Sequence, residues 1–198
     1  MRSVVSALTM SLALSVVLEA GPLTSPERQR LLAHLEMTES WLVDELAGLS
    51  AEQITFRMAP GTWTIADVVE HLAIAEPQYW EHFQVSLSAP AGEVKPEATD
   101  AGILWYGIDR TDRNRTGEAR QPSGRFKDSS ESLAAFRKLR NTMREYARET
   151  QEDLRGRMLK DGNMDVYQWF LMISTHAQRH ILQIREIKAH SDWPRAKS

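Results

Sequence analysis

Two histidines near the carboxyl end of the chain have the types and spacing of metal ligands. His176 and His180 are four residues apart, in or beside an apolar stripe that repeats at helical spacing from position 166 to 187. Side chains four apart on a helix lie one turn above each other, so both imidazoles can point at one ion. The pattern therefore predicts part of a metal site that faces the interior of a helical protein.

A third histidine lies on another segment with helical periodicity. His71 comes three residues after Val68 and four before Ala75, on or beside an apolar face. Three neutral imidazoles from two helices leave at least one coordination position open, as in a catalytic site. The alternative is that these are core histidines, each satisfied by a carbonyl or a carboxylate, and spacing alone leaves both interpretations open. The other histidines are expected to be structural: His34, His82 and His190.

The residue types restrict what chemistry such a site could perform. The chain has no cysteine, which excludes disulfides, thiolate metal sites and cysteine nucleophiles. A metal must therefore be held by His, Asp or Glu. The zinc-protease motif requires Glu directly after the first histidine of the pair, and that position is Ala177. The sequence identifies no catalytic acid or base.

Two glutamines and some of the tryptophans are candidates for supporting such a site. Gln183 is three residues past His180, and Gln78 is seven past His71. Either amide could orient a ligand ring or a bound water, although each is also an ordinary helix-surface residue. Aromatic side chains could wall a pocket, or belong to the core instead: Trp63, Trp80 and Trp169.

The elements that would position these residues are four long amphipathic helices. Helix-start residues precede each apolar stripe, and no segment shows strand alternation or a phosphate-binding glycine loop. Residues 88–127 lack periodicity, so we expect a long connection with at most a short helix near 103–113. The predicted fold is all-α, a four-helix bundle with a long crossover between the second and third helices. Its helices start near residues 25, 64, 129 and 165.

Length and charge narrow the function classes. The chain has 198 residues, enough for one domain, and its formal net charge is −3. This balance lacks the basic footprint that nucleic-acid binding requires. We therefore expect a small-molecule ligand and no nucleic-acid partner.

The first 20 residues have the layout of a secretory signal peptide. Arg2 precedes an uncharged, mostly apolar run over 4–18, and Ala20 supplies a small residue at the expected cleavage point. The run is too short for a bilayer, which takes about 20 apolar residues. We expect export to the periplasm or the exterior, with no transmembrane span after processing. An uncleaved anchor or an additional buried helix in a cytoplasmic protein is the alternative.

Two segments resemble motifs of one protein family, the DinB-like proteins. Residues 61–72 read Gly-Thr-Trp-Thr-Ile-Ala-Asp-Val-Val-Glu-His-Leu, similar to the start of that family's second helix. Residues 176–184 read His-Ala-Gln-Arg-His-Ile-Leu-Gln-Ile, similar to its final helix. The resemblance covers about residues 24–193 and implies a four-helix bundle that holds a divalent metal. Matched residue by residue, it implies His71, His176 and His180 as the ligands.

The resemblance also implies a small set of activities and metals. Members of the family include thiol transferases, a thiol-dependent isomerase and iron-binding domains, which suggests zinc, nickel, iron or manganese here. An exported protein would meet little cytosolic thiol, so metal-dependent hydrolysis is an equal expectation. Family members often dimerise, so a homodimer is also expected. The alternative function is a non-catalytic metal-binding or partner-binding module of the cell envelope.

Overall fold

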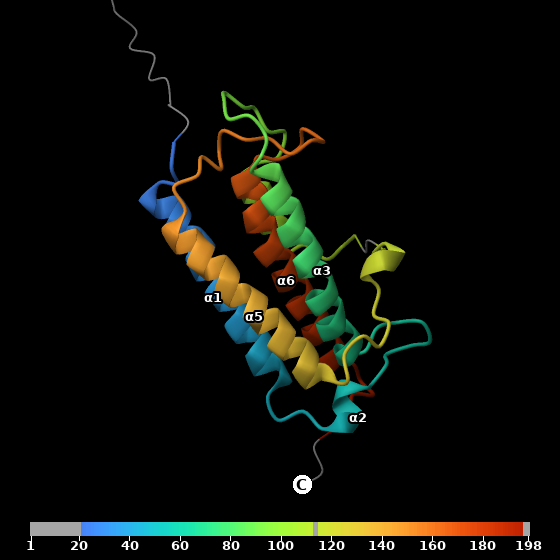
Figure 1. Ribbon diagram of the computed structural model, residues 1–198. Coiled ribbons are helices and arrows are strands. Elements are labelled where there is room, and N and C mark those ends of the chain that lie inside the picture. Colours follow the sequence, from blue (N-terminus) through green and yellow to red (C-terminus); the bar gives the residue numbers. More distant parts are fainter. Residues whose placement is uncertain (1–20, 113–114, 196–198) are drawn as a thin grey trace, which may run out of the picture.

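A computed structural model describes residues 21–112 and 115–195 of the chain. Its long helices are α1 (Ser25–Leu46), α3 (Ile65–Ser86), α5 (Ser129–Glu149) and α6 (Val166–Lys188) (Figure 1). The described residues contain no β-strand, which confirms the predicted all-α bundle. None of the described helices is long and apolar enough to cross a membrane. The predicted signal peptide, residues 1–20, lies outside the described residues.

The bundle's topology explains its long crossover. Each long helix contacts two others, α1 with α5 and α6, and α3 with the same two. Traced by colour in Figure 1, α3 and α5 run in the same direction although they follow one another in the chain. The connection 87–128 must therefore return along the length of the bundle. It carries α4 (Asp100–Tyr106) and a 3₁₀ turn, η1 (Glu118–Arg120).

Side-chain caps determine where the long helices begin. Thr24, Thr64 and Asp165 each accept a bond from the backbone N–H three residues on, and the residue there bonds back to the cap. These reciprocal pairs satisfy backbone donors that a helix start leaves free. At α5, Asp128 caps the helix, and Glu131 accepts from the Lys127 N–H, one residue before the cap.

The structure adds two details and corrects one expectation. A separate short helix, α2 (Ala51–Ile54), follows α1 and is capped by Ser50. Pro77 lies inside α3, which continues through it to Ser86. The short helix expected near 103–113 begins earlier and ends at Tyr106.

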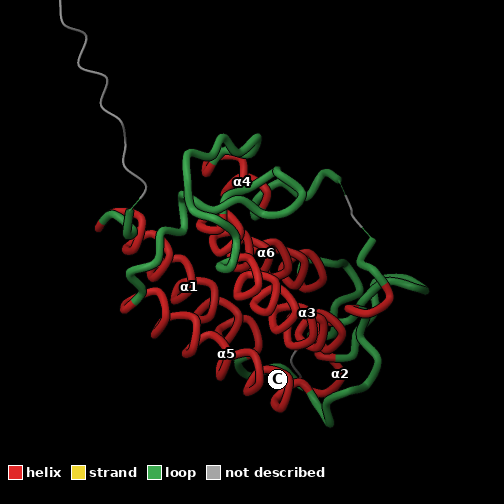
Figure 2. The backbone as a smooth tube through the Cα atoms, turned by 45° about the horizontal axis from the view of Figure 1, so that its top comes forward, coloured by secondary structure: helices red, strands yellow, loops and turns green. Residues whose placement is uncertain are grey.

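Helix α4 lies directly on α6 (Figure 2). At the end of α4, Gly107 approaches α6 so closely that a Cβ there would lie 3.0 Å from the Thr175 carbonyl oxygen. Only glycine has no side chain to obstruct this approach. Beyond this contact, Arg179 of α6 donates to the carbonyl oxygens of Tyr106 and Asp112. These bonds hold the start of the 107–121 segment against α6.

The core consists of two apolar clusters along the bundle axis. One contains the first two turns of α6, from Val166 to Ile173, and the other its second half, from Ala177 to Ile187. The boundary between them on α6 is the stretch 174–176, which is buried but carries polar side chains. The predicted histidine site lies at this boundary.

Candidate metal centre

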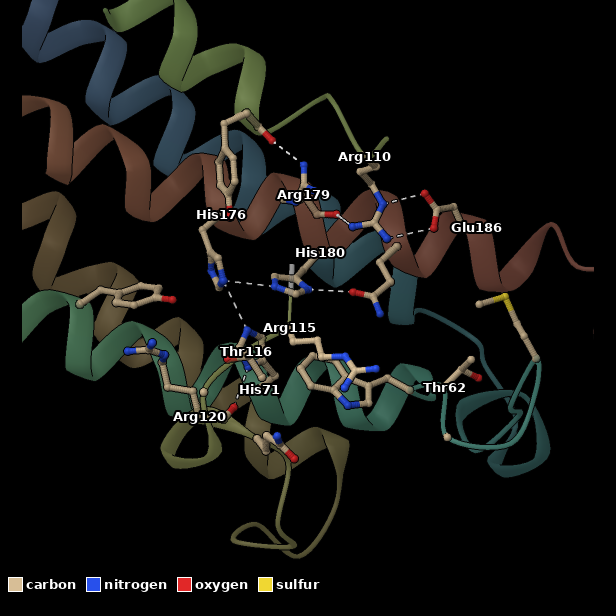
Figure 3. A pocket seen from close by; sticks show the side chains of 18 residues that line it. Thr62, His71, Arg110, Arg115, Thr116, Arg120, His176, Arg179, His180 and Glu186 are labelled. Carbon is tan, nitrogen blue, oxygen red and sulfur yellow. Dashed lines mark hydrogen bonds and ion pairs between the residues drawn. The ribbon is translucent and has the colours of Figure 1, made fainter. Parts of the chain in front are cut away.

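The three predicted histidines meet between α3 and α6 (Figure 3). The Nε2 atom of His176 lies 3.3 Å from that of His71 and 3.1 Å from that of His180. His71 and His176 are buried, at 1% and 5% exposure, and His180 is partly buried. The three ring nitrogens that converge are therefore screened from bulk water on most sides.

Hydrogen bonds on the far sides of two rings determine which nitrogens face inward as acceptors. His71 Nδ1 contacts the Arg120 carbonyl oxygen at 2.7 Å, and His180 Nδ1 contacts Gln183 Oε1 at 2.9 Å. Because these oxygens can only accept, each Nδ1 carries the proton. In the neutral rings, both Nε2 atoms then present lone pairs to the centre of the cluster.

Three neutral rings cannot form favourable hydrogen bonds at both of the Nε2–Nε2 contacts. The central ring, His176, can donate one Nε2 proton to one neighbour at most, which leaves the other contact between two lone pairs. The His176 Nδ1 is buried and has no hydrogen-bond partner among the described residues. A cation between the three Nε2 atoms would convert these unfavourable contacts into three favourable ones.

The spacing of the nitrogens also fits a metal ion. Nitrogens that each lie about 2.0–2.1 Å from a tetrahedral ion are separated by about 3.3–3.4 Å. The observed separations of 3.1 and 3.3 Å are close to that value. No carboxylate joins the cluster among the described residues. The protein thus offers three nitrogen ligands and leaves further coordination positions free.

Electrostatics keep the three imidazoles in the neutral form that coordination requires. Burial, followed by the neighbouring His180 and His71, places the pKa of His176 well below its ordinary value. Burial, and the repulsion that would arise between protonated His180 and His71, lower the pKa of His180 to about 3. Burial also lowers the pKa of His71, although its bond to the Arg120 carbonyl acts in the opposite direction. At neutral pH all three rings can bind a cation without first losing a proton.

The cluster opens into a cavity of about 650 Å³. Its walls are α3, α6, the loop 58–63 before α3, and parts of the crossover between 106 and 121. Trp63 lines the cavity with its ring 4.9 Å from that of His71, and the rings of Tyr79 and His176 form a T-shaped pair at 5.1 Å. The ligand atoms therefore face a space large enough for a small molecule, and not a solid core.

The structure separates the other candidates. Gln183 contacts the His180 ring, whereas Gln78 donates to the carbonyl oxygens of Ile74 and Ala119 and makes no hydrogen bond to a histidine among the described residues. Of the tryptophans, Trp63 lines the cavity, but Trp80 and Trp169 do not.

The remaining histidines lie outside the cluster. His34 bridges to α6 through Ser174 and Gln178. The His82 ring packs against Trp169, and the His190 ring against Phe56. All three make structural contacts of the kind that was expected of them.

Sequence reasoning did not identify four arginines that line the cavity: Arg110, Arg115, Arg120 and Arg179. Arg110 donates to both oxygens of Glu186, at 2.6 and 2.9 Å (Figure 3). Three of the four come from the non-periodic crossover, where spacing gives no indication of direction. The one available signal was a high density of arginine over 110–125 in a chain of net negative charge.

Comparison with known proteins identifies the fold and the family. YfiT from Bacillus subtilis, described as a probable metal-dependent hydrolase with an unusual four-helix bundle topology, superposes with a TM-score of 0.58. The alignment covers 87% of this chain and 91% of YfiT at 18% identity, which shows a common fold. No curated protein matches the sequence. A sequence model of the DinB superfamily matches residues 21–184. Because this model matches most of the chain, the chain belongs to the DinB superfamily.

Proposed function

We propose that this protein is a metal-dependent enzyme that binds one divalent ion through His71, His176 and His180 and acts on a small molecule. The observation that carries the proposal is the convergence of three Nε2 atoms, two of them locked as acceptors, at the wall of an open cavity. A structural ion would be closed by a fourth protein ligand, and none joins the cluster among the described residues.

The chain's own residues would prepare this site for hydrolysis. The Arg120 carbonyl and the Gln183 amide hold two ligand rings in the required tautomer. A divalent ion bound there would act as a Lewis acid on a carbonyl or phosphoryl oxygen and would lower the pKa of a coordinated water. Hydrolysis is supported by the description of YfiT as a probable metal-dependent hydrolase.

A second candidate is transfer of a low-molecular-weight thiol. Glu186 is the one carboxylate among the described residues that line the cavity, and Arg110 holds both of its oxygens. Burial raises the pKa of Tyr79, so its hydroxyl remains protonated at neutral pH. Apart from the three histidines, the described residues that line the cavity therefore include no free side-chain base, and a thiol would need none once the Lewis acid had lowered its pKa.

The first test is metal content. Protein purified without an affinity tag should contain about one equivalent of a single divalent metal by elemental analysis, with zinc, nickel, iron and manganese as the candidates. The His176→Ala variant should lose it. The matched control is His82→Ala, because His82 is exposed on the same helix as His71 but outside the cluster.

The second test is activity. Metal-loaded protein is assayed for hydrolysis of p-nitrophenyl acetate and p-nitrophenyl phosphate, and for substitution of an alkyl halide by glutathione or cysteine, with release of the halide ion and a proton. Activity in one assay should disappear with a chelator, return with the native metal and be absent in His176→Ala. Metal binding without any turnover would favour a non-catalytic metal-binding module, and absence of metal would overturn the proposal.

A further inference from the structure

We propose that Arg115 and Arg120 bind an anionic group of the small molecule, a carboxylate or a phosphate, beside the three histidines. This deepens the proposed function and relies on it only for the identity of the neighbouring metal. The two arginines would hold the molecule at one end while the histidine cluster faces the other. The anion site itself is argued from charges and contacts that do not depend on the metal.

The cavity is strongly positive in a protein that is negative as a whole. Four arginines and one glutamate line it, while the formal net charge of the whole chain is −3. Arginine is also the side chain best shaped to bind carboxylate and phosphate, because its fork can donate two parallel bonds. A concentration of this charge in one concave site favours an anionic ligand.

Two of the four arginines are engaged in building the wall. Arg110 is bonded to both oxygens of Glu186 and to the Arg179 carbonyl oxygen. The Arg179 side chain is nearly buried and donates to main-chain carbonyl oxygens of Tyr106 and Asp112. These contacts fix both side chains, and they leave the Arg179 charge without a carboxylate within 4.0 Å among the described residues.

The other two arginines, Arg115 and Arg120, line the cavity and form no ion pair among the described residues. Arg120 Nε is buried yet has no partner among the described residues, which is costly for a charged donor. The guanidinium is positioned 5.4 Å from the centre of the Tyr79 ring. Arg115 also lines the cavity (Figure 3), and no ion pair joins it to the rest of the described chain. An anion in the cavity would supply the counter-charge that both guanidiniums lack.

The arginine charges also act on the histidines. The four arginines and the three histidines line the same cavity, and the Arg120 carbonyl oxygen is bonded to His71 Nδ1. Repulsion from the arginine charges disfavours a divalent cation at the cluster. A bound anion would offset it, so anion and metal should each increase the affinity for the other by the same factor. This gives the arginines a role that metal binding alone does not explain.

The test is isothermal titration of the full-length protein with methyl phosphate and with succinate, with and without metal, at low ionic strength. Dimethyl succinate serves as the uncharged analogue. We expect one of the anions to bind, the diester not to bind, and binding to tighten when metal is present. Arg120→Gln and Arg115→Gln should each weaken the anion about tenfold or more, since each removes charge-assisted bonds. The preferred anion identifies the ligand group as phosphate or carboxylate.

The matched control is Arg148→Gln, an exposed arginine on α5 outside the cavity, which should change affinity less than about twofold. Circular dichroism establishes that each variant is folded, and Arg115→Gln decides the test if Arg120→Gln is not. Equal affinity of wild type and both variants would overturn the anion site, even in a protein that contains metal and hydrolyses esters. Arginine-dependent anion binding in a protein without metal would support this site and overturn the proposed enzyme.

Discussion

Arg140 of α5 and Glu76 of α3 form an ion pair in the interior of the bundle. Both side chains are fully buried, with Arg140 Nε 2.8 Å from Glu76 Oε2 and a second bond between Nη2 and Oε1. Arg140 also donates to Thr38 of α1, so one guanidinium links three helices. Burial raises the pKa of Glu76 and the Arg140 charge opposes that rise. Each charge therefore depends on the other.

Removal of one partner should destabilise the protein severely. Arg140→Met leaves the Glu76 carboxyl buried without its counter-charge, which costs about 3–5 kcal/mol. Urea unfolding measures the loss. The matched control is Arg137→Met, because Arg137 pairs with Glu39 but is 56% exposed, and such pairs contribute less than about 1 kcal/mol. The double variant Arg140→Met with Glu76→Met should recover much of the loss. Equal effects of the two single variants would contradict this account.

His34 should make stability depend on pH. Its ring lies between α1 and α6, and burial, partly offset by the bond to Gln178, lowers its pKa. In the unfolded chain the pKa is about 6.5, so below that pH the unfolded state binds a proton that the folded state does not. Stability should therefore be complete above about pH 6.5 and decrease as the pH falls.

The measurement compares wild type with His34→Gln. Urea unfolding at several pH values, with a chelator present throughout, cancels the contributions of the other histidines. Below about pH 6.5 the wild type should lose up to about 1.4 kcal/mol more per pH unit than the variant. Parallel pH dependence in the two proteins would show that His34 is readily protonated in the folded state.

Gln183 should contribute to metal affinity through the His180 ring. Gln183→Leu removes the oxygen that holds the Nδ1 proton, and loss of such a partner typically reduces metal affinity about 10- to 100-fold. Competition with a fluorescent chelator measures the dissociation constant. Gln78→Leu is the control, since Gln78 bonds only to main-chain oxygens. Loss of affinity in the control alone would reverse the assignment of the two residues.

Gly107 should tolerate no side chain. The Cβ of Gly107→Ala would lie 2.9 Å from Gln178 Oε1 and 3.0 Å from the Thr175 carbonyl oxygen, and a helix backbone cannot move aside easily. Overpacking of this kind costs about 1–3 kcal/mol. Thermal melting should show a lower midpoint for Gly107→Ala and little change for Gly92→Ala, where nothing lies within 4 Å. Similar midpoints would indicate that α4 can separate from α6.

The features that follow from helical periodicity could be predicted from the sequence. Apolar repeats and capping residues located the four long helices, and the spacing of His176 and His180 placed both rings on one face of the last helix. Gln183 was a sound candidate because a residue three positions on lies on the adjacent turn. Gln78 is seven residues from His71, two turns away, and its amide reaches neighbouring carbonyl oxygens first.

The cavity's arginines could not be predicted in this way. Arg110, Arg115 and Arg120 belong to a non-periodic segment whose course is determined by tertiary contacts, such as the bonds from Arg179 to Tyr106 and Asp112. The short helix α2 was missed because Ser50, which caps it, also suits a turn between helices. The conformation of the crossover and of α2 depends on contacts with distant parts of the chain, which local sequence patterns do not reveal.

The three histidines come from α3 and α6 alone, whereas α1 and α5 contribute none of the cluster. One pair of helices, α3 and α6, thus carries the histidine cluster, and the other pair, α1 and α5, supports it. Substitutions on the outward faces of α1 and α5 can alter heat resistance or solubility while the reactive half keeps its geometry. Stabilising or solubilising substitutions could therefore be made on α1 and α5, and substitutions that change reactivity on α3 and α6. The effects of the two sets should be nearly additive, because distant sites rarely interact.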